Sequence, residues 1–220
     1  KGGKILAVGS LADIEKYIDS DTEIIDYGDK MIMPGFVDGH THTGVAETVV
    51  GVDLTFIDDR NLATERVKAY LKANPDAKVV VGGGWYAAVW GGEAPDKSYL
   101  DAATTDIPVI IWDFDHHCNW VNSKALELAG IDAAFAKEFN AKAGNIQIAV
   151  DKDGNPTGYL QEGACKLMDS LMPQYSEKDL KYCIDIWSQY GVTAVNEMSE
   201  FHKFGDPVFS QLEALRDSGE

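Results

Sequence analysis

The chain has 220 residues, 45% of them hydrophobic and 10% aromatic, which is enough to bury one large domain, alone or with an appendage. Its formal net charge of −17 repels phosphate backbones and anionic headgroups, so we expect no nucleic-acid partner and no membrane partner. No apolar run reaches the length of a membrane span, and the three cysteines have neither metal-type nor disulfide-framework spacing. These features favour a reducing, cytoplasmic compartment.

The first thirty residues predict a small β-structure. Short strands are expected at residues 4–8 and 23–26, with a small helix at residues 12–18 between them. The chain starts at Lys1 rather than at a methionine, and its first strand begins abruptly. We therefore expect a further segment upstream of residue 1.

From residue 31 onward, long apolar runs alternate with helical patterns. The apolar runs are continuous, which is typical of strands covered on both faces of a parallel sheet, and they lie at residues 32–37, 78–81, 108–112 and 192–195. Helices are predicted at residues 61–73, 122–129 and 177–190, and from residue 206 towards 217. This alternation predicts an α/β fold with right-handed crossovers.

The expected architecture is about the first half of a (β/α)8 TIM-type barrel, because only about four strand–helix units follow residue 31. Residues 145–150 and 157–160 flank a turn and predict a β-hairpin inserted into the α/β pattern. A half barrel has two open edges. The chain is therefore expected either to be a piece of a larger polypeptide or to pair with another copy as a homodimer.

A His-x-His pair at the end of the first apolar run is the strongest chemical signal. His40 and His42 project to the same side of a strand, with Thr41 turned away. Two such imidazoles form half of a divalent-metal site, with zinc–nitrogen distances of about 2.0–2.1 Å. Asp38 either steadies a ligand imidazole or serves as a turn residue, and the alternative for the histidines themselves is an ordinary loop role.

Two further polar positions lie where strands are expected to end. His117 belongs to a dense polar run after the third strand and shares parity with Asp113, so either a second metal site or a simple histidine–aspartate hydrogen bond is conceivable. Glu162 follows a short apolar strand and precedes a helix. It could hold or bridge metal ions, or it could be a surface residue that complements the helix dipole.

Taken together, these segments resemble the amidohydrolase superfamily. The run Met33-Pro34-Gly35-Phe36-Val37-Asp38-Gly39-His40-Thr41-His42 is similar to the metal motif on the first barrel strand of that superfamily. Its YtcJ-like branch, which includes N-substituted formamide deformylases, is suggested by three more segments: Gly84-Trp85 with Trp90-Gly91-Gly92, His117 with Trp120-Val121-Asn122-Ser123-Lys124-Ala125-Leu126, and Gly158-Tyr159-Leu160-Gln161-Glu162. The run Gly191-Val192-Thr193-Ala194-Val195 resembles the strand that follows.

The resemblance implies a metal-dependent hydrolase that cleaves an amide-like, non-peptide C–N bond in a small molecule. Residues 1–30 would be the remnant of a small β-sandwich domain, and residues 31–220 would form the first half of the barrel with an inserted segment near residues 130–162. One or two divalent ions, with zinc the expected metal, would be held by His40, His42 and Glu162. Glu162 and His117 would be catalytic, with His117 lining the substrate pocket.

The chain also departs from this family. Members supply two more histidines and a catalytic aspartate from later strands, and at Asn196-Glu197 only the acid of a common histidine–acid pair is present. The chain is therefore expected to be the N-terminal portion of a longer enzyme. The alternative is a catalytically incomplete fragment that acts only in folding or self-association. A metal-dependent phosphoesterase is a weaker third possibility.

Overall fold

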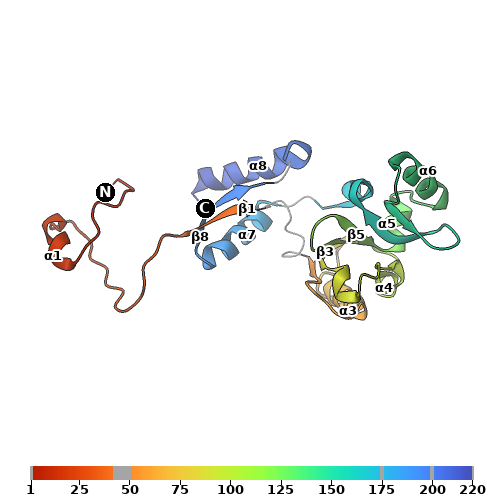
Figure 1. Cartoon of the computed structure of the whole chain (residues 1–220), viewed down its shortest axis with the longest axis horizontal. Helices are drawn as coiled ribbons and strands as arrows, with labels where there is room; N and C mark the ends of the chain where they lie inside the picture. The colour runs from red at the N-terminus through yellow and green to blue at the C-terminus, as the bar shows by residue number, and fades with distance from the viewer. Residues whose placement is uncertain (1, 42–50, 174–175, 199–200, 220) are drawn as a thin grey trace. The chain divides into compact units, whose positions relative to one another are not determined.

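The computed structural model describes residues 2–41, 51–173, 176–198 and 201–219 (Figure 1). It divides into two compact units, Lys1–Gly35 and Phe36–Glu220, and each is described by itself. Within the described ranges, no helix combines the length and the apolar character needed to cross a membrane.

The first unit contains one short helical segment and no strand among its described residues. Helix α1, Leu11–Ile14, continues into the 3-10 turn η1, Glu15–Tyr17, and a capping box between Ser10 and Asp13 begins it. The strands predicted at residues 4–8 and 23–26 are wrong for this structure. A strand needs a hydrogen-bonded neighbour, and here the apolar side chains of those segments stay exposed, Ile5 to 83% and Ile24 to 71%.

The second unit opens with a parallel strand pair that joins distant parts of the sequence. Strand β1, Phe36–Thr41, pairs with β8, Val192–Glu197 (Figure 1). Helix α7, Glu177–Gln189, precedes β8, and helix α8, Phe201–Ser218, follows it. The strand predicted at residues 32–37 therefore lies later in the chain than expected.

The chain between β1 and β8 forms a sheet of its own, with the strand order β2-β3-β4-β5-β7-β6. Three strands run parallel: β2, Val52–Asp53, β3, Val80–Trp85, and β4, Val109–Asp113. The other three strands pair antiparallel with their neighbours: β5, Cys118–Val121, with β4 and with β7, Pro156–Gln161, and β6, Ile148–Val150, with β7. The predicted hairpin is confirmed as β6–β7. The half barrel is not confirmed, because the four apolar runs are divided between two sheets and the larger sheet is mixed.

Both faces of the six-stranded sheet are covered. Val109 and Ile111 of β4 belong to one hydrophobic cluster, and Ile110 between them belongs to the other. Helices α3, Asn61–Ala73, and α4, Lys97–Asp101, contribute to the first cluster. Helices α5, Ser123–Leu128, and α6, Ala133–Ala143, contribute to the second together with the 3-10 segment η3, Glu162–Leu171. The continuous apolar run at residues 108–112 correctly predicted a strand buried on both faces.

Candidate active site

The first half of the His-x-His motif lies at the carboxyl end of β1. His40 is exposed and the next residue, Thr41, is buried. Asp38, within β1, uses its Oδ1 atom to accept a hydrogen bond from the His40 amide at 3.0 Å. The predicted ligand His42 lies outside the described residues.

The end of β8 lies beside this motif. Thr41 pairs with Glu197, the Met198 amide donates to the Thr41 carbonyl at 2.8 Å, and the Asn196 side-chain amide donates to the Gly39 carbonyl at 3.3 Å. Parallel strands bring their carboxyl ends to one edge, which is where α/β proteins place their sites. The polar residues at the end of β1 and the Asn196-Glu197 pair therefore share one edge.

No cluster of three or more histidine, cysteine or acidic side chains suited to a metal is present among the residues that the structure describes, a set that leaves out His42. Histidine nitrogen is a ligand that zinc accepts readily, and the exposed His40 imidazole at a strand end suits that role. A complete site at this edge requires His42 and at least one further ligand.

The second predicted cluster is built on the turn between β4 and β5. Asp113 ends β4 and is buried, with 7% exposure, and its Oδ1 accepts the backbone N–H groups of His117 and Cys118, both at 2.9 Å. Burial raises the pKa of the Asp113 carboxyl, and these two hydrogen bonds partly oppose the rise. A hydrogen bond between His117 and Asp113 was one of the two alternatives for this cluster, and the structure shows one that is donated by the His117 backbone N–H.

The structure brings His117 and Glu162 together. Their side chains approach to 3.2 Å between Nδ1 and Oε1, and the Glu162 amide donates to the His117 carbonyl at 2.8 Å. Both side chains are well exposed, His117 to 66% and Glu162 to 61%. The antiparallel pairing of β5 with β7 makes this contact, since Cys118 faces Gln161 in the register.

Sequence reasoning missed a partly buried thiol–phenol contact beside this pair. The Cys118 Sγ atom lies 3.3 Å from the Tyr159 hydroxyl. Desolvation raises the pKa of Cys118 to about 11, and it also raises the pKa of Tyr159. Side chains alternate along paired strands, so once β5 is paired with β7 the residues Cys118 and Tyr159 fall on the same face of the sheet. That alternation was the sequence signal that could have paired them.

Cys118 is therefore expected to react slowly with alkylating agents. A pKa raised from 9.0 to about 11 lowers the thiolate fraction at pH 8 by roughly 100-fold. Mass spectrometry of the Cys118 peptide after timed iodoacetamide treatment measures the rate. The same treatment in denaturant should restore ordinary reactivity, and equal rates in the folded and unfolded protein would contradict the prediction.

Three aromatic side chains also meet at the carboxyl ends of the parallel strands. Phe56, Tyr86 and Phe114 follow β2, β3 and β4, and the Phe56 and Phe114 rings lie 4.8 Å apart between centroids. All three are partly exposed, at 52%, 37% and 49% respectively. Tyr86 directly follows β3 and Phe114 directly follows β4, whereas Phe56 lies in the segment after β2. Only the sheet order shows that these three aromatic residues are neighbours.

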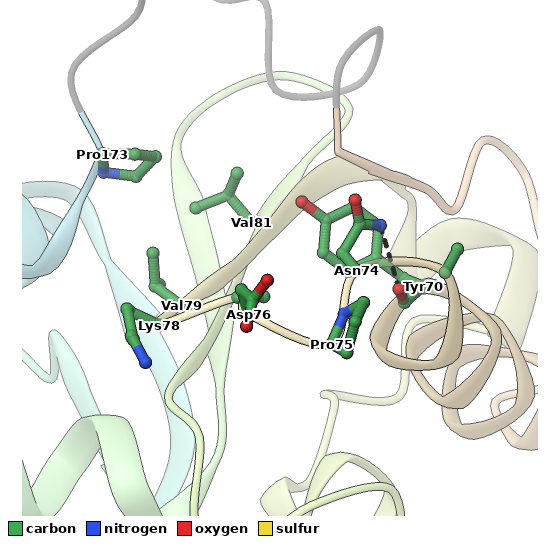
Figure 2. Close-up of a pocket in the computed structure, with 10 residues that line it drawn as sticks. Tyr70, Asn74, Pro75, Asp76, Lys78, Val79, Val81 and Pro173 are labelled. Atoms are coloured by element: carbon green, nitrogen blue, oxygen red, sulfur yellow. Dashed lines mark hydrogen bonds between the residues drawn. The ribbon is translucent and has the colours of Figure 1, made fainter.

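A surface pocket of about 560 Å³ lies elsewhere on this unit (Figure 2). Its lining includes Asn74, Asp76 and Lys78, which precede β3, and the Asn74 side chain donates to the Tyr70 carbonyl at 2.9 Å. These residues lie before the strand, on the amino-terminal side of the sheet. None of the predicted site residues lines this pocket.

The chain belongs to the amidohydrolase family, whose sequence profile matches residues 23–218. This match confirms the resemblance noted from the motifs.

Individual relatives agree with this assignment. The chain is 31% identical over 180 residues to the putative amidohydrolase YtcJ of Bacillus subtilis, covering 80% of this chain and 33% of that protein. It is 28% identical over 192 residues to the N-substituted formamide deformylase of Arthrobacter pascens, covering 84% and 34%. It is 27% identical over 209 residues to the exoenzymes regulatory protein AepA of Pectobacterium carotovorum, covering 90% and 44%.

A solved structure shows a similar fold. The crystal structure of an uncharacterized metal-dependent hydrolase from Pyrococcus horikoshii superposes with a TM-score of 0.55 at 22% identity, covering 85% of this chain and 34% of that one. The chain thus spans between a third and a half of the length of the relatives it matches.

Proposed function

We propose that this chain is part of a metal-dependent hydrolase that cleaves an amide-like, non-peptide C–N bond in a small molecule. The observation that carries the proposal is the position of Asp38 and His40 at the carboxyl end of β1, beside the end of β8, in a member of the amidohydrolase family. The formamide substrate named for the Arthrobacter pascens relative supports a C–N bond of this kind.

We propose a domain organisation in two parts. Residues 1–30 are proposed to belong to a small β-sandwich, and residues 31–220 to the first part of a barrel with an insertion. The direct pairing of β1 with β8 supports an insertion larger than residues 130–162, because the whole six-stranded sheet lies between these two strands in the sequence.

His40, His42 and Glu162 are the residues proposed to hold one or two divalent ions, with zinc the expected metal. Such an ion, when bound, lowers the pKa of a coordinated water towards about 7 and polarises a scissile carbonyl. His117 is proposed to line the substrate site, where its Nδ1 lies 3.2 Å from Oε1 of Glu162. The exposed aromatic cluster of Phe56, Tyr86 and Phe114 suits an apolar substituent on a small substrate.

Removal of metal from the full-length polypeptide tests this function. Treatment with a chelator is expected to abolish hydrolysis of a panel of formamides and other N-substituted amides, and added divalent ions should restore it. Circular dichroism before and after treatment shows whether the fold survives. Hydrolysis that persists without metal, or a panel that is never cleaved at any metal loading, would sink the proposal.

The same preparation tests two finer parts of the proposal. The free thiols of Cys118, Cys165 and Cys183 suit a cytoplasmic location, and the exposed Phe36 and Val37 on β1 suit a homodimer. Sedimentation should show a dimer, and fractionation of cells should place the protein in the cytoplasm. A monomer, or a secreted protein, would contradict the corresponding part.

A further inference from the structure

The backbone of His117 is held at both of its polar groups. Its N–H donates to Oδ1 of the buried Asp113 at 2.9 Å, and the N–H of Cys118 converges on the same oxygen at 2.9 Å. On the other side, the His117 carbonyl accepts the Glu162 amide at 2.8 Å and lies 3.5 Å from the Cys165 Sγ. A buried carboxylate that receives two backbone donors defines the conformation of this turn.

Two strained residues flank this arrangement. His116 has a φ of +58° and Glu162 a φ of +50°. Residues other than glycine rarely adopt this left-handed backbone conformation. Glycine would adopt both conformations with less strain. The surrounding hydrogen bonds therefore impose the local geometry, and backbone strain of this kind gathers at functional sites.

The contact between the His117 and Glu162 side chains is too weak to produce this geometry. Both groups are more than half exposed, so water screens their attraction. The approach of Nδ1 to Oε1 at 3.2 Å must then follow mainly from the backbone frame beneath it.

We propose that Asp113 is a positioning residue for His117. By fixing the backbone of the turn, it directs Nδ1 of the imidazole to the Glu162 carboxylate. A carboxylate oxygen accepts a hydrogen bond, so in the neutral imidazole this contact selects the tautomer with hydrogen on Nδ1 and leaves Nε2 as the acceptor towards a ligand. The inference rests on the proposed function only in taking that ligand to be the substrate.

Nitrogen-15 NMR of the His117 ring in the full-length protein tests the tautomer directly. In the neutral imidazole of the unmodified protein we expect the hydrogen on Nδ1 and none on Nε2. The opposite tautomer would overturn the proposal, and this measurement requires neither catalysis nor a variant.

Two substitutions at Asp113 test the positioning role. Asp113→Asn keeps the accepting Oδ1 and should leave the ring signals unchanged and kcat within about threefold of the unmodified enzyme. Asp113→Ala removes the acceptor, and it should mix the two tautomers and lower kcat by about tenfold or more, with a smaller change in KM. Asp153→Ala, at an exposed aspartate in the β6–β7 turn of the same sheet, is the matched control and should change neither.

The outcomes separate this inference from the proposed function. Unchanged ring signals in folded Asp113→Ala, or equal damage from both Asp113 variants, would overturn the positioning role even in an active enzyme. The expected ring signals in a protein that cleaves no amide would support the positioning role while the proposed function fails. If Asp113→Ala does not fold, the ring signals of the unmodified protein still test the proposal, because the opposite tautomer overturns it.

Discussion

Full-length polypeptide carrying His40→Asn is expected to lose its bound metal and at least about 100-fold of its hydrolytic activity. Mutation of a residue that hydrogen-bonds a metal ligand typically lowers metal affinity or activity by about 10–100-fold. Loss of a ligand itself should therefore have a larger effect. His40 is exposed at the end of β1, so its replacement should cost little folding stability. Metal content by elemental analysis and kcat/KM on the amide panel measure the effect.

His116→Asn is the control for this variant. His116 stacks on Trp112 with ring centroids 5.5 Å apart and has a positive φ, which asparagine tolerates better than most residues. This variant should keep its metal. Full metal content and activity in His40→Asn would show that His40 is not a ligand, and the proposed site would have to be abandoned.

Replacement of Asn122 by alanine should be among the most destabilising single changes in the chain. Asn122 is fully buried and makes four hydrogen bonds to backbone groups, each at 3.0 Å. Its Oδ1 accepts from the amides of Val109 and Ala125, and its Nδ2 donates to the carbonyls of Thr104 and Ile107. Each buried backbone group left unsatisfied costs about 1–3 kcal/mol, so we expect a loss of about 4 kcal/mol or more.

Asn119 offers a matched control for this prediction. It is also fully buried, but neither its Oδ1 nor its Nδ2 has a hydrogen-bond partner within the part of the chain that the structure describes. Removing an unsatisfied buried amide offsets the cavity it leaves, so Asn119→Ala should change the free energy of unfolding by no more than about 1 kcal/mol. Urea unfolding monitored by tryptophan fluorescence compares the two variants, and similar losses would contradict the distinction.

Local sequence patterns were reliable where one segment carries all the relevant information. The helix predicted at residues 61–73 is α3, Asn61–Ala73, and the helix predicted at residues 177–190 is α7, which begins with a capping box of Ser176 and Asp179. The hairpin at β6–β7 was also predicted, because its turn residues and alternating pattern are adjacent in sequence. Helix periodicity and capping depend on contacts three or four residues apart.

Strand pairing could not be read in the same way. Hydrophobicity correctly marked apolar strands, but it does not state which strand lies beside which, and it gave no sign that β1 pairs with β8. The short strand β5 and the helix α6 were not predicted at all. The segments at residues 4–8 and 23–26 carry strand-like patterns without any partner in the first unit.

The same distinction between local sequence patterns and long-range pairing applies to the candidate site. The residues of the chain alone identified His40, His42, His117 and Glu162 as chemically significant and pointed to the correct family, because residue type and short spacing are properties of the chain itself. Only the folded structure shows three further features of the site. His117 contacts Glu162, Asp113 hydrogen-bonds the turn that carries His117, and three aromatic rings lie together at neighbouring strand ends. These contacts join residues far apart in sequence, and their geometry is set by strand register and burial, which no local pattern encodes.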